Sequence, residues 1–454
     1  MSVNRLTSRN IGSVARIGPN DLMTNDPDIL RRMSSARSKY GRSHWYEVAK
    51  LNPYLHSVGS EPDEKRHQEL RTKLSAGYSG KEIPDFEGIV DKHVLELVDL
   101  IERKYISDGT DIRPCDVARK IQYFTLDTIT DIAFGEPFGD VPADEDVHRY
   151  IQTIEDMFPL MFILQGIPGA LKVMQAMQRN AWLSPLIMPS HTDRAGFGTM
   201  MGLAKRIVAE RFGPNKKEKP DQLGSFIRHG LTQEEAEGET LLQITAGSDT
   251  TAGGIRSTIM HLITQPTAFN RLRQEISEAE KNNRISKPII SNAEARALPY
   301  LQACIKEGLR LLPPVTSLLS KKVPPGGDIL DGKFVPEGTD VGYCAWSVHR
   351  NKAVFGEDAE CFRPQRWLEA SPEQLVRMDQ TAELIFGYGR YGCLGRVLAL
   401  TELNKVIVEV SLDDLLVAQR LLRPTNRARH IFAAVSPVRF CDNKSYTPVE
   451  LQDD

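Results

Sequence analysis

Hydrophobic residues recur at helical spacing over much of the first half of the chain. Between about residues 85 and 203 the pattern is mostly that of amphipathic helices, as in the stretch IVDKHVLELVDLIERKY at 89–105. Apolar residues return there every three or four positions, so that one face of each helix can pack against a core. The pattern predicts several helices in this region.

A longer helix is predicted from residue 232 to 265. Thr232 and Glu235 stand three residues apart, as the members of a capping box do, and Pro266 ends the pattern. At 1.5 Å per residue, a helix of about 33 residues is about 50 Å long, enough to cross a whole domain. A further helix is predicted at 300–312, where Pro313 and Pro314 end it.

The sequence also predicts a smaller amount of sheet. Residues 14–26 alternate around Gly18, Pro19 and Asn20, which favours a strand, a turn and a second strand. Asp26 then precedes a predicted helix start, and short strand-like pieces follow residue 312 up to about residue 346. Strands and helices do not alternate as they do around a parallel sheet. The predicted fold class is therefore mainly α with small β-sheets.

The composition is that of a soluble globular protein, with 41% of the 454 residues hydrophobic and 26% charged. The chain has 57 Lys and Arg against 60 Asp and Glu, a formal net charge of −3, so nucleic acid is not an expected partner. The six cysteines are widely scattered without a C-x-x-C pair. This spacing predicts neither a disulfide framework nor a zinc site, and it favours a reducing compartment.

Small residues interrupt the long helix at its midpoint, in the stretch AGSDTTAGG at 246–254. Each glycine in a helix interior costs about 1 kcal/mol relative to alanine. Two explanations stand side by side. The small residues leave room for a ligand or water, next to the acid of Asp249 and the hydroxyl of Thr250, or they only permit a close crossing with another helix.

The predicted helix at 300–312 carries Glu307 and Arg310 three residues apart, on one face. An E-x-x-R pair arises by chance about once or twice in a chain of this length, so alone it indicates a helical ion pair. Arg366, in FRPQRW at 362–367, could join it as a buried triad. Buried charges have to be paired in this way, and such triads fix geometry more than they stabilise.

The stretch FGYGRYGCLGRVLAL at 386–400 surrounds Cys393 with glycines. Glycines let backbone amides turn toward the sulfur, and a helix beginning near residue 394 directs its positive end at it, which stabilises a thiolate. Gly395 would let a flat ligand lie close, and Arg390 would meet an anionic group on that ligand. One cysteine with one open side suits a single axial bond to iron. The alternative, a buried structural cysteine, leaves the glycines, Phe386 and Arg390 without a common reason.

With these motifs in this order, the sequence resembles the cytochrome P-450 family of haem-thiolate monooxygenases. FGYGRYGCLG fits the F-G-x-G-x-x-x-C-x-G cysteine loop, with the usual arginine at Arg390; AGSDTT fits the oxygen-binding helix, and KEGLR the E-x-x-R motif. FRPQRW is similar to the P-E-R-F segment, with Gln365 in place of glutamate. The resemblance covers about residues 11–410 and is greatest to fungal microsomal members such as pisatin demethylase.

The resemblance implies a haem b cofactor, iron protoporphyrin IX, with Cys393 as the proximal iron ligand. His67 and Arg71 match the H-x-x-x-R motif that binds haem propionates; residues four apart share a helix face, although a solvated charged face is the simpler explanation of the same residues. Lys321 stands where many relatives carry another propionate-binding arginine. Lysine supplies a point charge there rather than a fork of donors.

The resemblance also implies a reaction. O2 would bind against Ala246 and Gly247, Thr250 would hydrogen-bond it, and Asp249 would relay protons to it through water. One oxygen atom would enter a mostly apolar, small organic substrate of the secondary-metabolite or xenobiotic type, by hydroxylation or O-demethylation. Substrate contacts are expected from residues 51–61, from the middle of the long helix and from residues 315–319.

Electrons would come from a separate NADPH-cytochrome P-450 reductase, with cytochrome b5 as an optional second donor, because the chain has no flavin or nicotinamide motif. Two alternatives remain beside the monooxygenase. One is a haem-thiolate isomerase, dehydratase or peroxide-using enzyme, which the intact Asp249–Thr250 pair disfavours. The other is an inactive or truncated relative that binds haem.

Both ends of the chain depart from the family pattern. Family members carry an N-terminal membrane helix and lie on the cytosolic face of the endoplasmic reticulum, whereas this chain opens with the polar stretch MSVNRLTSRN. As given, it is expected to lack an anchor and to be soluble in the cytoplasm. Residues 411–454 do not resemble the closing strands of the family. The predicted organisation is one domain, 1–454, with this atypical end.

Overall fold

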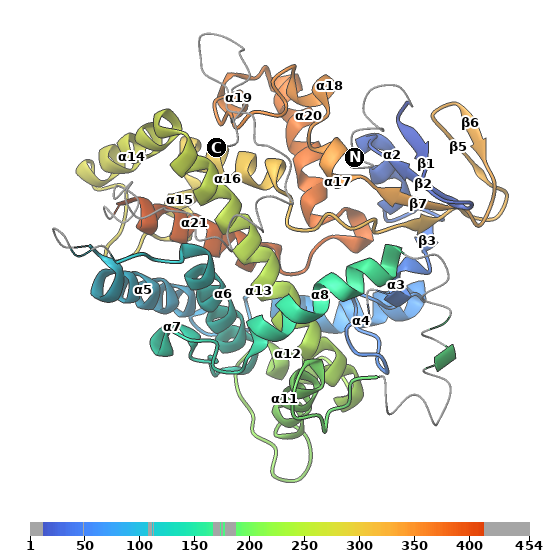
Figure 1. Ribbon diagram of the computed structural model, residues 1–454, viewed down its shortest axis with the longest axis horizontal. Coiled ribbons are helices and arrows are strands. Elements are labelled where there is room, and N and C mark those ends of the chain that lie inside the picture. Colours follow the sequence, from blue (N-terminus) through green and yellow to red (C-terminus); the bar gives the residue numbers. More distant parts are fainter. Residues whose placement is uncertain are drawn as a thin grey trace.

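The chain is mainly helical with two small sheets, as the sequence predicts. Figure 1 shows the long helix α13 (Gln233–Thr264) crossing the middle of the molecule. A capping box between Thr232 and Glu235 begins it, and Pro266 opens the next helix, α14 (Pro266–Lys281), so both predicted ends are confirmed. The computed structural model describes residues 12–48, 50–107, 111, 113–166, 173, 176–177 and 188–412.

The other long helices pack around α13. The helices that contact it include α6 (Val117–Phe134), α11 (Phe197–Ala209), α16 (Pro299–Leu311) and α21 (Arg396–Leu412), and α5 (Phe86–Tyr105) packs against both α6 and α21. The remaining described helices are α2 (Pro27–Ser34), α3 (Trp45–Val48), α4 (Glu64–Tyr78), α7 (Asp140–Ala143), α8 (Tyr150–Gly166), α12 (Gln222–Arg228), α15 (Asn292–Arg296), α17 (Ala345–Val348), α18 (Lys352–Phe355), α19 (Arg366–Glu369) and α20 (Pro372–Ala382), with the 3-10 turns η1 (Glu383–Phe386) and η2 (Gly389–Tyr391).

Strands from distant parts of the chain form a five-stranded sheet, in the order β1-β2-β7-β4-β3, on the right of Figure 1. The predicted strand–turn–strand unit is confirmed as antiparallel β1 and β2, and β2 also runs parallel to β7. β3 pairs with β4 so that Arg42 stands opposite Lys321, which makes two basic residues neighbours. The strands of this sheet are β1 (Val14–Arg16), β2 (Asp21–Thr24), β3 (Gly41–Arg42), β4 (Lys321–Lys322) and β7 (Asp340–Tyr343), and β5 (Asp328–Leu330) and β6 (Lys333–Val335) form a separate hairpin.

Glycines let α13 and α16 approach each other closely. A Cβ atom at Gly254 would lie 2.8 Å from a methyl carbon of Leu309, and one at Gly308 would lie 2.4 Å from the hydroxyl oxygen of Thr258. Interiors packed to crystal density cannot absorb such overlaps without moving a helix. The close-crossing explanation of the small residues in α13 is therefore confirmed at Gly254.

The cysteines depart from expectation at one position. Cys115, Cys304, Cys344 and Cys393 are free thiols, whereas Cys361 is disulfide-bonded. The expectation that the scattered cysteines form no disulfide is wrong at Cys361, because spacing along the chain does not show which distant residues meet. Among the described residues, no helix combines the length and the apolar character needed to cross a bilayer.

Glu307 and Arg310 on α16 meet Arg366 of α19 in the core. Arg310 donates to the two carboxylate oxygens of Glu307 at 2.8 and 2.9 Å, and Nε of Arg366 donates to Oε1 at 2.8 Å. The indole nitrogen of Trp367 adds a hydrogen bond of 2.9 Å to Oε2. Further donors of Arg310 reach the backbone carbonyls of His349, Ala359 and Cys361. The triad thus ties α16 to the segment that precedes α19.

The triad is fully buried and remains charged. Burial alone would raise the pKa of Glu307, but the charges and hydrogen bonds of Arg310 and Arg366 lower it to about 2. The carboxylate therefore stays ionised at physiological pH. Because desolvation offsets much of the attraction, the triad fixes the relative position of its helices more than it adds net stability.

Glu307→Gln should lower the free energy of unfolding by about 3–5 kcal/mol, because it leaves two buried guanidinium groups without their counter-charge. Denaturant unfolding measures this change. The control is Glu357→Gln, which removes one partner of an exposed pair with Lys352 at 2.6 Å and should change little, since exposed ion pairs contribute little. Equal effects of the two variants would contradict a structural role for the triad.

Candidate functional site

The loop before α21 can be built only with glycine at two positions. Gly387 and Gly389 have φ values of +72° and +58°, a region that other residues rarely adopt. A Cβ atom at Gly387 would lie 2.6 Å from the carbonyl oxygen of Tyr391, and one at Gly389 would lie 2.3 Å from that of Ser34. Both glycines are therefore required by backbone conformation and by space.

Cys393 sits between this loop and the first turn of α21. Its amide donates to the carbonyl of Phe386 at 2.6 Å, which closes the loop. The helix begins at Arg396, two residues later than expected. A Cβ atom at Gly395 would be 3.9 Å from the Cys393 sulfur, an ordinary contact, so the bare glycine leaves open space beside the thiol. Phe386 is half-buried, with the guanidinium of Arg396 5.4 Å from its ring centroid.

The Cys393 thiol faces hydrogen-bond donors, as the glycine pattern predicts. It is the exposed member of the four free cysteines in the described part of the chain. Protein atoms still surround the sulfur on most sides, and this burial raises the pKa of Cys393. The amides of Gly395 and Arg396, together with the charge of Arg71, act in the opposite direction and favour the thiolate. The net effect is a raised pKa, so Cys393 is an accessible thiol whose ionised form the nearby amides stabilise in part.

Four basic side chains surround the ring of Tyr391, two residues before the cysteine, and a fifth lies beside the neighbouring Gly392. They come from four places in the fold: α4, β3, β4 and the cysteine loop. The Nζ atom of Lys321 lies 3.0 Å from the ring centroid, and the Arg42 and Arg390 guanidinium carbons lie 5.3 and 5.2 Å from it. The His67 ring centroid is 5.4 Å away. Arg71, one turn after His67 on α4, reaches to 3.9 Å from the position of a Cβ at Gly392. The basic cluster is Arg42, His67, Arg71, Lys321 and Arg390.

The basic cluster is short of negative charge. Burial, followed by the charges of Arg42, Arg71, Lys321 and Arg390, lowers the pKa of His67 to about 3. Burial and the neighbouring arginines also lower the pKa of Lys321 well below its usual value. The carboxylate of Glu64 lies 3.6 Å from Nε of Arg390. A ligand with several anionic oxygens would supply what these groups lack.

Unpaired donors in the basic cluster identify where such a ligand would bind. Nδ1 of His67 and Nε of Arg42 and Arg390 are buried without a hydrogen-bond partner. Unpaired buried polar atoms are rare and call for an explanation. The two propionate groups of haem would satisfy them, with the thiol of Cys393 next to the same cluster. The residues present therefore fit the cofactor that the sequence predicts.

Arg390 has a second role that the sequence did not show. Its guanidinium donates to the backbone carbonyls of Ser38 and Tyr40 at 2.8 and 2.7 Å. These bonds hold the cysteine loop against the segment between α2 and β3. Both bonds use the Nη2 atom, so the expected contact of Arg390 with an anion would involve its other guanidinium nitrogens.

The face of α13 expected to meet O2 is only partly as predicted. Ala246 is exposed, and the Thr250 hydroxyl donates to the carbonyl of Ala246 at 2.7 Å. Gly247, however, packs against α6, because a Cβ there would lie 2.5 Å from Cγ1 of Ile129. The Cβ side of Gly247 therefore serves a helix crossing and is filled by Ile129, and the expectation that O2 lies against Gly247 stays a prediction.

Asp249 is turned away from Thr250, toward α6 and α8. Burial raises the pKa of Asp249, whereas hydrogen bonds from Tyr150 and Gln122 act to lower it. Tyr150 and Gln122 were not identified from the sequence as partners of Asp249. Also missed were Arg42 of the basic cluster and Tyr391, whose ring lies at the centre of that cluster. A tyrosine or glutamine inside an amphipathic helix carries no motif, and only the packing of three helices brings these side chains to one carboxyl.

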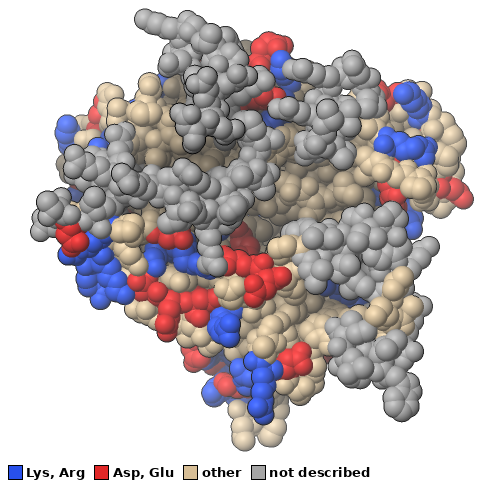
Figure 2. All heavy atoms as spheres, in the orientation of Figure 1, with Lys and Arg blue, Asp and Glu red and all other residues tan. Residues whose placement is uncertain are grey.

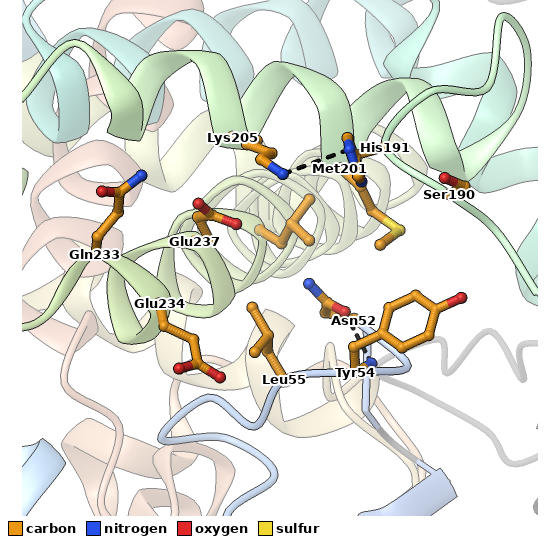
Figure 3. A pocket seen from close by; sticks show the side chains of 11 residues that line it. Asn52, Tyr54, Leu55, Ser190, His191, Met201, Lys205, Gln233, Glu234 and Glu237 are labelled. Carbon is orange, nitrogen blue, oxygen red and sulfur yellow. Dashed lines mark hydrogen bonds between the residues drawn. The ribbon is translucent and has the colours of Figure 1, made fainter. Parts of the chain in front are cut away.

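A cavity of about 630 Å³ opens near the start of α13. Figure 3 shows Asn52, Tyr54 and Leu55 facing the first turns of α13, with Met201 and Lys205 of α11 on the opposite side. Three of its lining residues belong to the predicted substrate loop at 51–61. Residues 315–319 do not line it. The cavity is completed by Ser190, His191, Gln233, Glu234, Glu237 and Leu241.

Acidic and basic residues are interspersed on the described part of the face in Figure 2. Many charged residues of the described chain form exposed ion pairs, among them Arg396–Glu383 at 3.0 Å and Lys352–Glu357 at 2.6 Å. No broad field of one sign covers this face. The basic cluster around Tyr391 is different because its members are largely buried and converge on one point.

Comparison with known proteins identifies relatives that extend over most of the chain. The family description of cytochrome P-450 matches residues 21–410. The chain is 44% identical to cytochrome P-450 monooxygenase ABA1 of Pyricularia oryzae over 405 residues, 88% of this chain and 78% of that protein. It is 38% identical to monooxygenase aba1 of Botryotinia fuckeliana over 90% of this chain and 80% of the relative. Monooxygenase abl1 of Leptosphaeria maculans is 36% identical over 90% of this chain and 71% of the relative.

Arg71→Met should speed the loss of bound haem about 10- to 100-fold, because a hydrogen bond to a charged group contributes about 1.5–3 kcal/mol and each 1.4 kcal/mol is tenfold. Transfer of haem to excess apomyoglobin measures the rate. Arg66→Met is the matched control on the same helix, since Arg66 is exposed and pairs with Glu61 at 3.2 Å. Equal rates in the two variants would contradict propionate binding by the basic cluster.

Proposed function

The chain belongs to the cytochrome P-450 family and is a monooxygenase similar to fungal members, and we propose that it inserts one oxygen atom of O2 into a mostly apolar small molecule, by hydroxylation or O-demethylation. The observation that carries this proposal is the Cys393 thiol, which is accessible, faces the amides that begin α21 and lies beside a buried cationic cluster. The finer likeness to pisatin demethylase remains a prediction.

The haem-binding residues follow from this geometry. Cys393 would be the axial ligand, and the basic cluster of Arg42, His67, Arg71, Lys321 and Arg390 would bind the propionates. Bound haem supplies the activation of O2, with the thiolate as the electron-donating ligand. The glycine loop and the amides of α21 would hold the sulfur in place and offset part of the cost of ionising it for that bond.

Protons would be delivered from α13. Thr250 lies one turn from Ala246 on the same helix face, and its hydroxyl already bonds to the Ala246 carbonyl, so it would orient a proton donor next to the reacting oxygen. Asp249 would supply the proton through water. The intact acid–hydroxyl pair supports a monooxygenase rather than an isomerase or dehydratase.

The substrate would approach along the cavity beside the start of α13. Its lining combines Leu55, Met201 and Leu241 with polar groups at its rim, including Lys205 and His191, whose nitrogens are 3.4 Å apart. This mixture fits a moderately sized, mostly apolar molecule with a few polar atoms, such as a secondary metabolite or a xenobiotic.

Electrons would come from NADPH-cytochrome P-450 reductase, and cytochrome b5 would serve as a second donor. These partners and a position on the cytosolic face of the endoplasmic reticulum follow from family membership. A binding assay between the purified chain and the reductase, read as reduction of the haem by NADPH, tests the first of them.

Cys393→Ser should abolish the strongly red-shifted Soret band that the reduced protein gives with carbon monoxide, because that band requires a thiolate ligand. The CO difference spectrum measures it. Cys115→Ser is the control, since Cys115 is a buried free thiol outside the cysteine loop, and it should leave the band unchanged. A wild-type spectrum without the red-shifted band would favour an inactive relative of the family.

Thr250→Ala should raise the share of consumed NADPH that ends as hydrogen peroxide several-fold, because a positioned proton donor speeds its step by about 10²–10⁴-fold and its loss leaves time for peroxide to escape. Peroxide release per NADPH in the reductase-coupled enzyme measures this uncoupling. Thr264→Ala is the matched control, because the Thr264 hydroxyl makes the same bond to the carbonyl four residues back, at 2.8 Å, near the other end of α13. Unchanged peroxide release in Thr250→Ala would remove Thr250 from proton delivery.

A further inference from the structure

Polar side chains from two other helices hold Asp249 at the place where α6, α8 and α13 meet. The Tyr150 hydroxyl, at the first residue of α8, donates to Oδ2 of Asp249 at 2.7 Å. The side-chain amide of Gln122 on α6 donates to Oδ1 at 2.6 Å and also lies 2.8 Å from the hydroxyl of Ser248. Tyr150, Gln122 and Ser248 are all buried, so both carboxylate oxygens have partners inside the protein.

The charged groups that act on Asp249 are already bonded elsewhere. They are Arg256, seven residues further along α13, and Glu155 on α8. Nε of Arg256 donates to the Ala118 carbonyl at 2.8 Å, and Glu155 pairs with Arg119 at 3.3 Å. Asp116 also acts on Arg256. In the described part of the chain, neutral donors therefore make the direct contacts with the Asp249 carboxyl.

We propose that Tyr150 and Gln122 are positioning residues for proton delivery: they hold the Asp249 carboxyl on the α6–α8 side and set the pH at which it carries a proton. This rests on the proposed function, in which Asp249 supplies protons beside Thr250. The proton leaves the Asp249 carboxyl oxygen through water toward Thr250, and the carboxylate regains a proton from solvent water. Tyr150 and Gln122 neither gain nor lose a proton in this cycle.

The directions of the pKa shifts of Asp249 and Tyr150 agree with these positioning roles. Burial raises the pKa of Asp249, and the bonds from Tyr150 and Gln122 limit that rise. Burial, with the neighbouring charge of Asp249, raises the pKa of Tyr150 well above its usual value, so the phenol stays protonated and acts only as a donor. Removing either donor destabilises the ionised carboxyl and raises the pKa of Asp249 further.

Thermal unfolding tests this linkage without any substrate. Tyr150→Phe should lower Tm most at alkaline pH, where Asp249 is ionised, and the deficit should shrink as pH falls through the folded-state pKa of Asp249. With Asp249→Asn in both proteins, the deficit should be the same at every pH. A deficit independent of pH in both backgrounds would overturn the proposal. If Tyr150→Phe does not fold, Gln122→Leu provides the same test.

Reduction of O2 by the holoenzyme, driven by NADPH and the reductase without added substrate, provides the second readout. The ratio of NADPH to O2 consumed reports whether peroxide or water forms. The pH at which water formation declines should rise by about one unit in Tyr150→Phe and in Gln122→Leu, the shift expected for one lost charge-assisted hydrogen bond. Tyr105→Phe is the control, because it loses a hydroxyl bond of the same 2.7 Å length, to Asp144, away from α13.

The role of Asp249 and the roles of its two donors can be tested separately. If Asp249→Asn leaves the ratio and its pH profile unchanged, Asp249 does not deliver protons and that part of the proposed function is lost. If Asp249→Asn changes the profile while Tyr150→Phe and Gln122→Leu leave it at the wild-type pH, only the positioning roles are wrong. A shift in Tyr105→Phe as large as in Tyr150→Phe would also overturn them.

Discussion

The structure depends on holding one sulfur atom, that of Cys393, against backbone amides at the N-terminal end of α21. The amides of Gly395 and Arg396 face the Cys393 thiol and oppose the effect of its burial. That arrangement requires the left-handed conformations of Gly387 and Gly389, and it requires the backbone near Ser34 to lie within reach of Gly389. The N-terminal segment, the cysteine loop and the first turn of α21 therefore act as one unit, because a side chain at either glycine would move the sulfur away from its donors.

The fold contains two buried groups of basic and acidic side chains. One holds helices in position, and the other is suited to bind a ligand. In the triad of Glu307, Arg310 and Arg366, the carboxylate accepts hydrogen bonds from both guanidinium groups, and the pKa of Glu307 falls to about 2. In the basic cluster around Tyr391, by contrast, His67, Arg42 and Arg390 each keep a buried nitrogen without a partner. Buried polar nitrogens without a hydrogen-bond partner are costly, and they persist where a ligand compensates them. The first group holds helices together, and the second is incomplete without an anion.

The sequence predicted the helices better than the contacts between them. The ends of α13 follow from a cap and a proline, which are local signals, and the Cys393 loop follows from glycines that act within a few residues. Arg42, Tyr150 and Gln122 could not be predicted, because each reaches its partner across the fold from an element with no motif of its own. The surroundings of Gly247 could not be predicted from the sequence for the same reason. Its neighbour Ile129 lies on α6, and only the helix crossing decides whether that glycine leaves room for a ligand or is filled by a side chain.

The kind of group that contacts Asp249 also determines how much free energy is needed to release its carboxyl. A buried ion pair costs about 3–5 kcal/mol to break, since the remaining charge is left desolvated. A hydrogen bond from a neutral donor to an ionised carboxyl contributes less, about 1.5–3 kcal/mol, and Tyr150 and Gln122 are such donors at 2.7 and 2.6 Å. A cationic partner would also lower the pKa of Asp249 and leave it without a proton to deliver. Neutral donors therefore hold the Asp249 carboxyl in one position and still allow it to carry a proton.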